Sequence, residues 1–263
     1  MGKLLKAELY RIVKSKLFLI ALIAAAVFPF LMILLYLVVA DQMESSPEMA
    51  ALGTFEMSAR GLADQGFSMS NNLGLMIPVF AAIFVGQDVS NGTLRNKLIA
   101  GRSRKQVYFS HLISTSIVSG GLMLLYVLLL TGFGCLIFEY GATFDKAEAV
   151  RFAYFLITGL FTFFFAAAIA TALSLTLKNM AGAIVSTTLV CMVLSLTASI
   201  FHTVPSLASS KWMCLIPTYT TSGFLSRGAF SFTEFGLGLL SLLVTGAAVT
   251  AAGLIVFTKK DVK

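Results

Sequence analysis

The chain has 263 residues, of which 58% are hydrophobic and only 12% are charged, and its mean hydropathy is +0.91. Soluble domains carry roughly 25% charged residues, so this composition excludes a soluble globular protein and indicates an all-α protein that crosses a membrane several times. The net charge of +7 would suit a nucleic-acid partner, but the positions of the basic residues assign that charge to membrane topology instead.

The first predicted element is an amphipathic helix within residues 1–16. Its apolar face consists of Leu5, Leu9, Ile12 and Val13. Its other faces carry Lys3, Lys6, Arg11 and Lys14. This pattern is typical of a helix that lies among the lipid headgroups, in the plane of the bilayer. A plain positively charged anchor that only fixes the orientation of the chain is the alternative.

Six stretches without Asp, Glu, Lys or Arg follow, each long enough to cross about 30 Å of hydrocarbon as a helix of about 20 residues. They predict membrane spans at about residues 17–40, 68–87, 107–135, 152–177, 180–201 and 235–257, within one domain of residues 1–263. The first stretch is longer than the core of a signal peptide, which is roughly 7–15 residues, and therefore favours an uncleaved anchor.

The basic residues gather on one side of these spans. Fourteen of the 19 Lys and Arg residues lie in the N-terminal segment, the connection between spans two and three, position 178 and the C-terminal tail. Only three acidic residues, Glu8, Asp88 and Asp261, lie on this side. Because cytoplasmic connections carry the excess of Lys and Arg, both termini are predicted to face the cytoplasm.

The connection between spans two and three contains a second short helix. Ser90 or Asn91 is in position to cap a helix that begins near Gly92, and Gly101 is in position to end it. An apolar stripe is formed by Leu94, Leu98 and Ile99. The alternative is a solvated, positively charged loop.

Two segments are predicted on the opposite side of the membrane. Residues 41–72 carry Glu44, Glu48, Glu56 and Asp64. A solvated acidic loop is the favoured interpretation, and a surface helix that contacts substrate is the alternative. Residues 212–226 form a short apolar stretch with Pro217, typical of a re-entrant or interfacial segment.

Small residues predict where the spans contact one another. They align as Ala166, Ala170 and Ser174 on span four, Gly182 and Ser186 on span five, and Gly246, Thr250 and Gly253 on span six. Packing within the chain is the favoured interpretation, and contact between two copies is the alternative.

No catalytic, cofactor-binding or metal-binding residue is assigned. The sequence has no phosphate-binding G-x-x-x-x-G-K-[ST] loop and no signature of an intramembrane protease. His111 and His202 lie near the ends of spans, where a lone histidine is more often a wetted interfacial residue than a proton carrier. If nucleotide energy drives this protein, another chain must bind the nucleotide.

Three patches of the sequence resemble a known family. Asp88 with Asn91-Gly92-Thr93-Leu94-Arg95, then Gly101-Arg102-Ser103-Arg104 and Tyr108, is similar to the coupling segment of type-2 ATP-binding-cassette (ABC) transporter permeases. The start, Leu4 to Lys16, resembles the interfacial helix of these permeases, and the end, Phe257 to Lys263, resembles their tail. Length, span number and topology agree with the family over the whole chain.

The resemblance implies a role for each patch. The coupling residues would be Asp88, Asn91, Gly92, Thr93, Arg95, Leu98, Gly101, Arg102 and Arg104, and the interfacial helix would use Lys6, Glu8, Arg11 and Lys14. The coupling segment would dock on a separate ABC ATPase, present in two copies, which binds ATP and Mg²⁺. A second permease chain, identical or related, would complete the path, and residues 202–233 would form two re-entrant outer helices.

We therefore expect the transmembrane permease subunit of an ATP-driven exporter in the bacterial cytoplasmic membrane, of the antimicrobial-peptide immunity and export kind. The aromatic-rich, charge-free spans favour an amphipathic substrate, a peptide or a lipid-like molecule. Its partners would be the ATPase, the second permease and membrane lipids, and no nucleic acid. The alternative function is a non-transporting membrane scaffold or sensor subunit.

Overall fold

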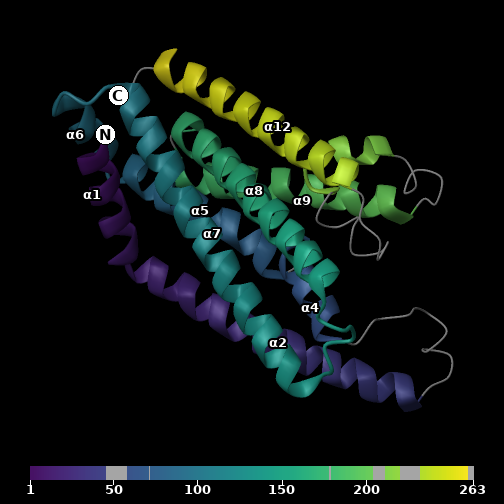
Figure 1. The fold of residues 1–263 in the computed structure, drawn as a ribbon. Helices are drawn as coiled ribbons and strands as arrows, with labels where there is room; N and C mark the ends of the chain where they lie inside the picture. Colours follow the sequence, from purple (N-terminus) through teal and green to yellow (C-terminus); the bar gives the residue numbers. More distant parts are fainter. Residues whose placement is uncertain (46–57, 71, 178, 204–210, 220–231, 260–263) are drawn as a thin grey trace.

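The computed structural model describes residues 1–45, 58–70, 72–177, 179–203, 211–219 and 232–259, and this part of the chain is helical without any strand (Figure 1). Six of its helices are long and apolar enough to span a membrane. They are α2 (Lys16–Ser45), α5 (Asn72–Ser90), α7 (Arg104–Ile137), α8 (Lys146–Leu177), α9 (Met180–Thr203) and α12 (Phe232–Lys259). The predicted all-α, six-span architecture is confirmed.

Several helices extend beyond the apolar stretches that predicted them. Helix α8 begins at Lys146 rather than near residue 152, because Asp145 accepts a hydrogen bond from the backbone N–H of Glu148 (2.9 Å) and so caps the first turn. Helix α7 likewise begins at Arg104, where the Ser103 hydroxyl accepts from the Gln106 N–H (3.3 Å). In α7 and α8, polar residues at the N-terminal end therefore extend the helix beyond its apolar stretch.

Helix α8 is the most buried of the six spans and packs against α5, α7, α9 and α12. Its small residues allow this close approach, since Ala166 and Ala170 are fully buried. The Ser174 hydroxyl donates to the backbone oxygen of Ala82 on α5 (3.2 Å). On α12, Gly253 lies directly against Tyr108 and Ala172. For these residues of spans four and six, packing within the chain is confirmed.

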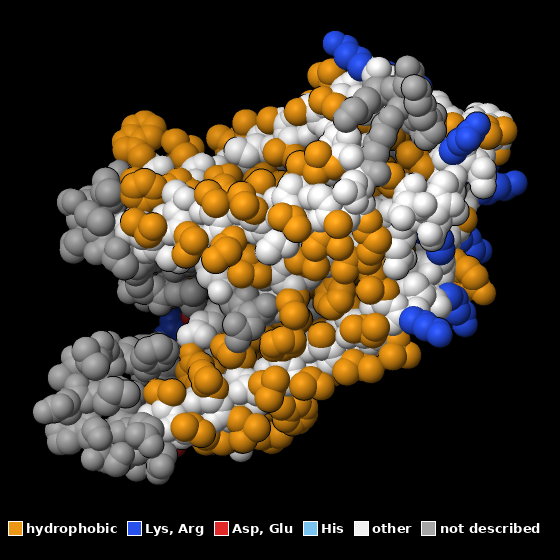
Figure 2. Space-filling view, turned by 180° about the vertical axis from the view of Figure 1, so that it is seen from behind, with side chains coloured by type: hydrophobic (Ala, Val, Ile, Leu, Met, Phe, Trp, Pro, Cys, Tyr) orange, Lys and Arg blue, Asp and Glu red, His pale blue; other side chains and the backbone are white. Residues whose placement is uncertain are grey.

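Four short elements complete the described fold. Helices α1 (Gly2–Val13) and α6 (Thr93–Ile99) lie at the same end of the bundle as the last turn of α12 (Figure 1). The surface there is rich in Lys and Arg, whereas hydrophobic side chains cover the spans (Figure 2). The 3₁₀ helix η1 (Lys211–Leu215) packs on α12, and the Ser241 hydroxyl donates to the Leu215 oxygen (2.5 Å).

Helix α4 (Ala59–Gly66) corrects the interpretation as a solvated acidic loop for the part of residues 41–72 around Asp64. It packs against α7, and Asp64 is only 7% exposed. Arg151 of α8 donates to Asp64 Oδ2 (2.6 Å), so the carboxylate ties α4 to span four instead of facing water. Burial raises the pKa of Asp64, and Arg151 offsets part of that effect.

Some sequence predictions fall outside the described residues. They concern the side chains of Glu44, Glu48, Glu56 and His202 and most of the two re-entrant helices between spans five and six. Within that last segment Trp212 is 76% exposed and Tyr219 is 2% exposed. The re-entrant helices stay a prediction.

Candidate functional site

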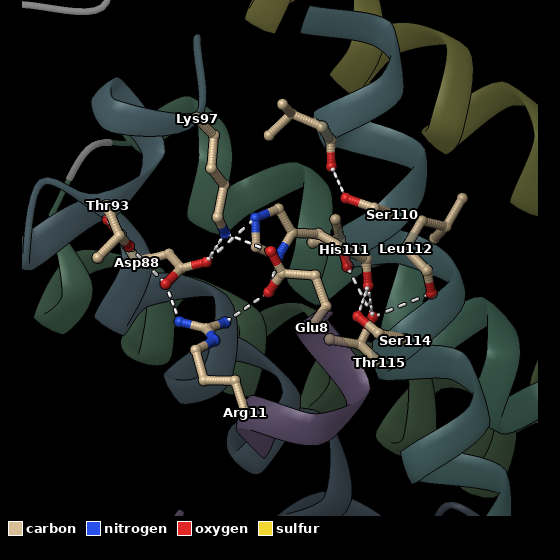
Figure 3. A network of polar contacts seen from close by, with 12 residues as sticks. Glu8, Arg11, Asp88, Thr93, Lys97, Ser110, His111, Leu112, Ser114 and Thr115 are labelled. Atoms are coloured by element: carbon tan, nitrogen blue, oxygen red, sulfur yellow. Dashed lines mark hydrogen bonds and ion pairs between the residues drawn. The ribbon is translucent and has the colours of Figure 1, made fainter. Parts of the chain in front are cut away.

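A network of buried charges lies where α1, α5, α6 and α7 meet (Figure 3). Its members are Glu8 and Arg11 on α1, Asp88 at the end of α5, Lys97 on α6 and His111 on α7. Asp88 is fully buried, and Glu8 and His111 are 2% and 1% exposed. Four separate segments of the chain are therefore joined by ionic contacts.

The two basic residues satisfy both carboxylates. Lys97 Nζ lies 2.5 Å from Asp88 Oδ2 and also contacts Glu8 Oε1. Arg11 donates to Glu8 Oε2 (2.9 Å) and pairs with Asp88 Oδ1. Asp88 Oδ1 accepts a further hydrogen bond from the Thr93 hydroxyl (2.6 Å). All four carboxylate oxygens have a donor, as burial of a charged group requires.

His111 faces both carboxylates. Its Nε2 lies 3.3 Å from Asp88 Oδ2, and its Nδ1 lies 3.9 Å from Glu8 Oε2. The prediction that His111 is a wetted interfacial residue is therefore wrong. Helix α1 packs against α7, and this contact cannot be inferred from the sequence of α7 alone.

The electrostatics of the network are close to balanced. Burial acts to raise the pKa of Glu8, but its interactions with His111, Lys97 and Arg11 outweigh this effect and hold the pKa below its ordinary value. Burial is also the main reason that the pKa of Lys97 is lowered, and the Glu8 carboxylate offsets part of this effect. Two carboxylates and two basic groups leave no net charge when His111 is neutral.

The network does not fit a metal centre. Glu8, Asp88 and His111 are residue types that ligate metals, and one donor atom of each lies within 4.8 Å of the others. However, the Lys97 ammonium and the Arg11 guanidinium already hold the carboxylate oxygens, so a metal ion would have to displace them. The geometry is that of an ionic joint.

Helix α6 begins differently from the prediction. Its N-cap is Gly92, which has a left-handed backbone (φ +68°) and no capping side chain, so capping by Ser90 or Asn91 is wrong. The Thr93 hydroxyl instead bonds to Asp88 across the turn. The predicted end is confirmed, because the helix stops at Ile99 and Gly101 has φ +80°.

The predicted apolar stripe of α6 is divided between the interior and the surface. Leu94 is 5% exposed and packs with Val85 and Val107, and Leu98 lies half-buried against the same cluster. Ile99 is 73% exposed. A groove of about 530 Å³ runs along this side and is lined by Arg95, Leu98, Ile99, Arg102, Ser103 and Arg104.

The predicted coupling residues thus point in two directions. Asp88 and Thr93 turn inward, so the predicted coupling residue Asp88 lies inside the bundle, where it is inaccessible to another protein. Arg104 donates to the Thr258 oxygen (2.8 Å) and ties the start of α7 to the end of α12. The exposed predicted residues are Asn91, Gly92, Arg95, Gly101 and Arg102.

The residues predicted for the interfacial helix also divide into exposed and inward-facing ones. Lys6 and Lys14 are exposed, whereas Glu8 and Arg11 belong to the network. On the outer side of α1, Tyr10 and Val13 are 66% and 53% exposed. The helix therefore has one face on the bundle and one apolar face directed outward; a place among lipid headgroups stays a prediction.

Lys97 and His111 were not among the predicted site residues. A usable signal was the scarcity of acidic residues on the basic side of the membrane, because two of the three are Glu8 and Asp88. A carboxylate at the end of a span needs a nearby base when it is buried. The sequence does not show which of many bases supplies it.

Comparison with known proteins gives one match. A family model described as ABC-2 family transporter protein matches residues 4–197, which include α1, α6 and the whole network. No curated protein and no solved structure matches the chain.

Proposed function

The chain belongs to the ABC-2 family of transporter proteins, and from this premise we propose that it is the permease of an ATP-driven exporter whose separate ATPase docks on α6. As an ABC-2 permease it is a multi-pass membrane subunit of an ABC transporter. The proposal adds the direction of transport, the docking site and the assembly.

The main support for docking on α6 is that one side of this helix packs on the bundle and the other side is exposed. Leu94 and Lys97 fix its inner side to the bundle, while Ile99 is left 73% exposed on its outer side. Arg95 and Arg102 flank Ile99 along the groove. An exposed apolar side chain between two cations suits a partner surface that is apolar at its centre and acidic around it.

The assembly follows from what this sequence lacks. The sequence has no phosphate-binding loop, so we propose that ATP and Mg²⁺ bind to the partner ATPase, which the resemblance expects in two copies. We propose a second permease chain, identical or related, beside this one. The end of the bundle with α1, α6 and both termini would face the cytoplasm of a bacterial cell, because that end carries the excess of Lys and Arg.

The proposed substrate is amphipathic, a peptide or a lipid-like molecule, as in export that gives resistance to antimicrobial peptides. Support comes from the composition of the spans, which are aromatic-rich and free of Asp and Glu over their central stretches. Such a path offers apolar contact but no charged groups to replace the hydration shell of a small ion.

The test replaces Ile99 by Asp and measures how much ATPase is retained when the complex is purified in mild detergent. The new charge desolvates poorly at the centre of an interface, so loss of most of the ATPase is expected. Arg95→Glu should retain part of the ATPase but lose stimulated ATP turnover. Leu98→Asp is less informative, since Leu98 also packs against the chain's own Leu94 cluster.

Two controls accompany these variants. Ile99→Leu keeps an apolar side chain and should retain the ATPase. Thr143→Asp adds the same charge to an exposed site between α7 and α8 and should also retain it. If Ile99→Asp and Arg95→Glu both keep full assembly and full turnover, α6 is not the docking site. If the wild-type chain binds no ATPase and stimulates no ATP turnover, it is a scaffold or sensor.

A further inference from the structure

We propose that Lys97 is a positioning residue that fixes α6 to three spans, so that movement of α6 by a docked ATPase is transmitted to the bundle. The inference rests on the proposed function and deepens it, because it concerns the inner side of α6, which the ATPase does not touch.

The backbone alone holds α6 weakly. The helix has only seven residues, far fewer than an isolated helix needs for stability. Gly92 and Gly101 flank it, and both have left-handed backbones with open space around them. The orientation of α6 must therefore come from its inward side chains, which are Thr93, Leu94, Lys97 and Leu98.

Among these side chains, Lys97 makes directional contacts with two other helices, whereas the Thr93 hydroxyl bonds only to Asp88. The contacts of Leu94 are apolar and tolerate sliding, because dispersion and hydrophobic attraction have little angular preference. The Lys97 ammonium instead contacts Asp88 on α5 and Glu8 on α1 at the same time. A rotation of α6 that moves the ammonium away from either carboxylate costs a charge-assisted contact, which is stronger than a contact between neutral groups.

The carboxylates that Lys97 holds lead directly to the spans. Asp88 lies in the last turn of span two. Glu8 lies on α1, which is joined to span one by a tight turn in which the Ser15 hydroxyl donates to the Ile12 oxygen (2.7 Å) and accepts from the Phe18 N–H (3.1 Å). Both carboxylates also face His111 on span three (Figure 3). One ammonium therefore links α6 to spans one, two and three.

The experiment compares Lys97→Met with Lys97→Arg in the complex with the ATPase. Met keeps the apolar stem but removes the charge, and Arg keeps a cation that reaches both carboxylates. Two quantities are measured: the amount of ATPase retained on purification, and the ATP turnover of the complex relative to the ATPase alone. Lys105→Met is the matched control, since Lys105 is an exposed base at the start of α7.

For Lys97→Met we expect full retention of the ATPase and at least a fivefold loss of the turnover that the permease adds. Lys97→Arg and Lys105→Met should both stay within twofold of wild type. Unchanged turnover in Lys97→Met would overturn the proposal. Release of the ATPase by Lys97→Met, as expected for Ile99→Asp, would overturn it too, because Lys97 would then support docking rather than transmission.

A double variant separates loss of the Lys97 bridge from misfolding of the chain. Lys97→Met leaves two buried carboxylates with one arginine, and this imbalance can destabilise the chain. Lys97→Met combined with Glu8→Gln restores charge balance but not the bridge, so the double variant should fold, retain the ATPase and remain uncoupled. If the double variant recovers wild-type turnover, the bridge does not transmit movement. Failure of docking in the wild-type chain would count against the proposed function instead.

Discussion

Glu8 shows how a carboxylate becomes part of an apolar interior. It is 2% exposed, yet each of its oxygens meets a cation, Lys97 at Oε1 and Arg11 at Oε2. The attraction between these charges outweighs the cost of desolvation, so its pKa lies below the ordinary value of 4.5. The same contacts make the stability of this region depend on pH.

The first prediction concerns that dependence. Because the pKa of Glu8 is lower in the folded chain, its contribution to stability is fully present above pH 4.5 and is lost as the pH falls through the folded pKa. Glu8→Gln should lower the unfolding temperature at about pH 7. On acidification from about pH 5 to 3.5, the unfolding temperature of this variant should fall by less than that of the wild-type chain. Calorimetry in detergent measures both. The groups that face Glu8 are Arg11, Asp88, Lys97 and His111.

The comparison of variant and wild type isolates Glu8. Asp64 acts with the opposite sign, since its raised pKa makes protonation favour the folded chain as the pH falls. An exposed acid, Glu139, provides the control, and Glu139→Gln should follow the wild-type curve. Parallel curves for Glu8→Gln and wild type would show that Glu8 keeps an ordinary pKa and contradict its ionic role.

Among the elements, α12 depends on close contact at one glycine. A Cβ atom built on Gly253 would lie 2.5 Å from Tyr108 Oη and 2.6 Å from Ala172 Cβ. The Ala172 backbone is also near, with its Cα 3.1 Å away, so α8 cannot yield by rotating a side chain. The absent side chain at position 253 sets the distance between spans six and four.

The second prediction follows from this contact. Gly253→Ala should destabilise the chain by about 1–3 kcal/mol, the usual cost of overpacking a tight core. Gly236→Ala in the same helix is the matched control, because nothing lies within 4 Å of a Cβ at that position. There the change should be neutral or stabilise by up to roughly 1 kcal/mol through helix propensity. Equal unfolding temperatures for the two variants would refute tight packing at Gly253.

At the scale of the whole molecule, ionic contacts occupy the two ends of the bundle. One end holds the network of Glu8, Asp88 and Lys97, and the other holds Asp64 and Arg151. The helical surface between them is largely hydrophobic (Figure 2). This distribution suits a bilayer, in which the central hydrocarbon tolerates charges poorly and the two interfaces accept them.

The third prediction tests which end faces the cytoplasm. In a variant without Cys135, Cys191 and Cys214, single cysteines are placed at Asn91 and Thr143, both exposed and at opposite ends. A membrane-impermeant thiol reagent applied to intact cells should label only position 143, and position 91 should react after permeabilisation. The reverse pattern would invert the proposed topology and remove α6 from the reach of a cytoplasmic ATPase.

Much of the fold was predictable because it depends on local composition. Each span needs about 20 apolar residues in a row, whatever its neighbours are, so hydropathy located all six. The two short helices were also found, since α1 and α6 each have a periodic apolar pattern. The family was recognisable from patches of sequence around α6 and α1, and its model covers both.

The candidate site was only half predictable. Asp88 and Glu8 were identified by resemblance, but as parts of surface helices, and Lys97 and His111 were missed. The reason is that burial of a charge is not a property of its own segment. Asp88 is buried because α1 brings Arg11 to it and α6 brings Lys97, and the same carboxylate without them would have to face water.

The sequence by itself therefore determined the number of spans, the side on which basic residues gather and the membership of the ABC-2 family, because each depends on residues close together in the chain. Only the tertiary structure decided which side of α6 faces inward, that Ile99 rather than Leu98 is the exposed apolar residue, and that Lys97 joins two carboxylates. These outcomes require segments distant in sequence to pack together, and the energy of a buried ion pair exists only once both partners have arrived.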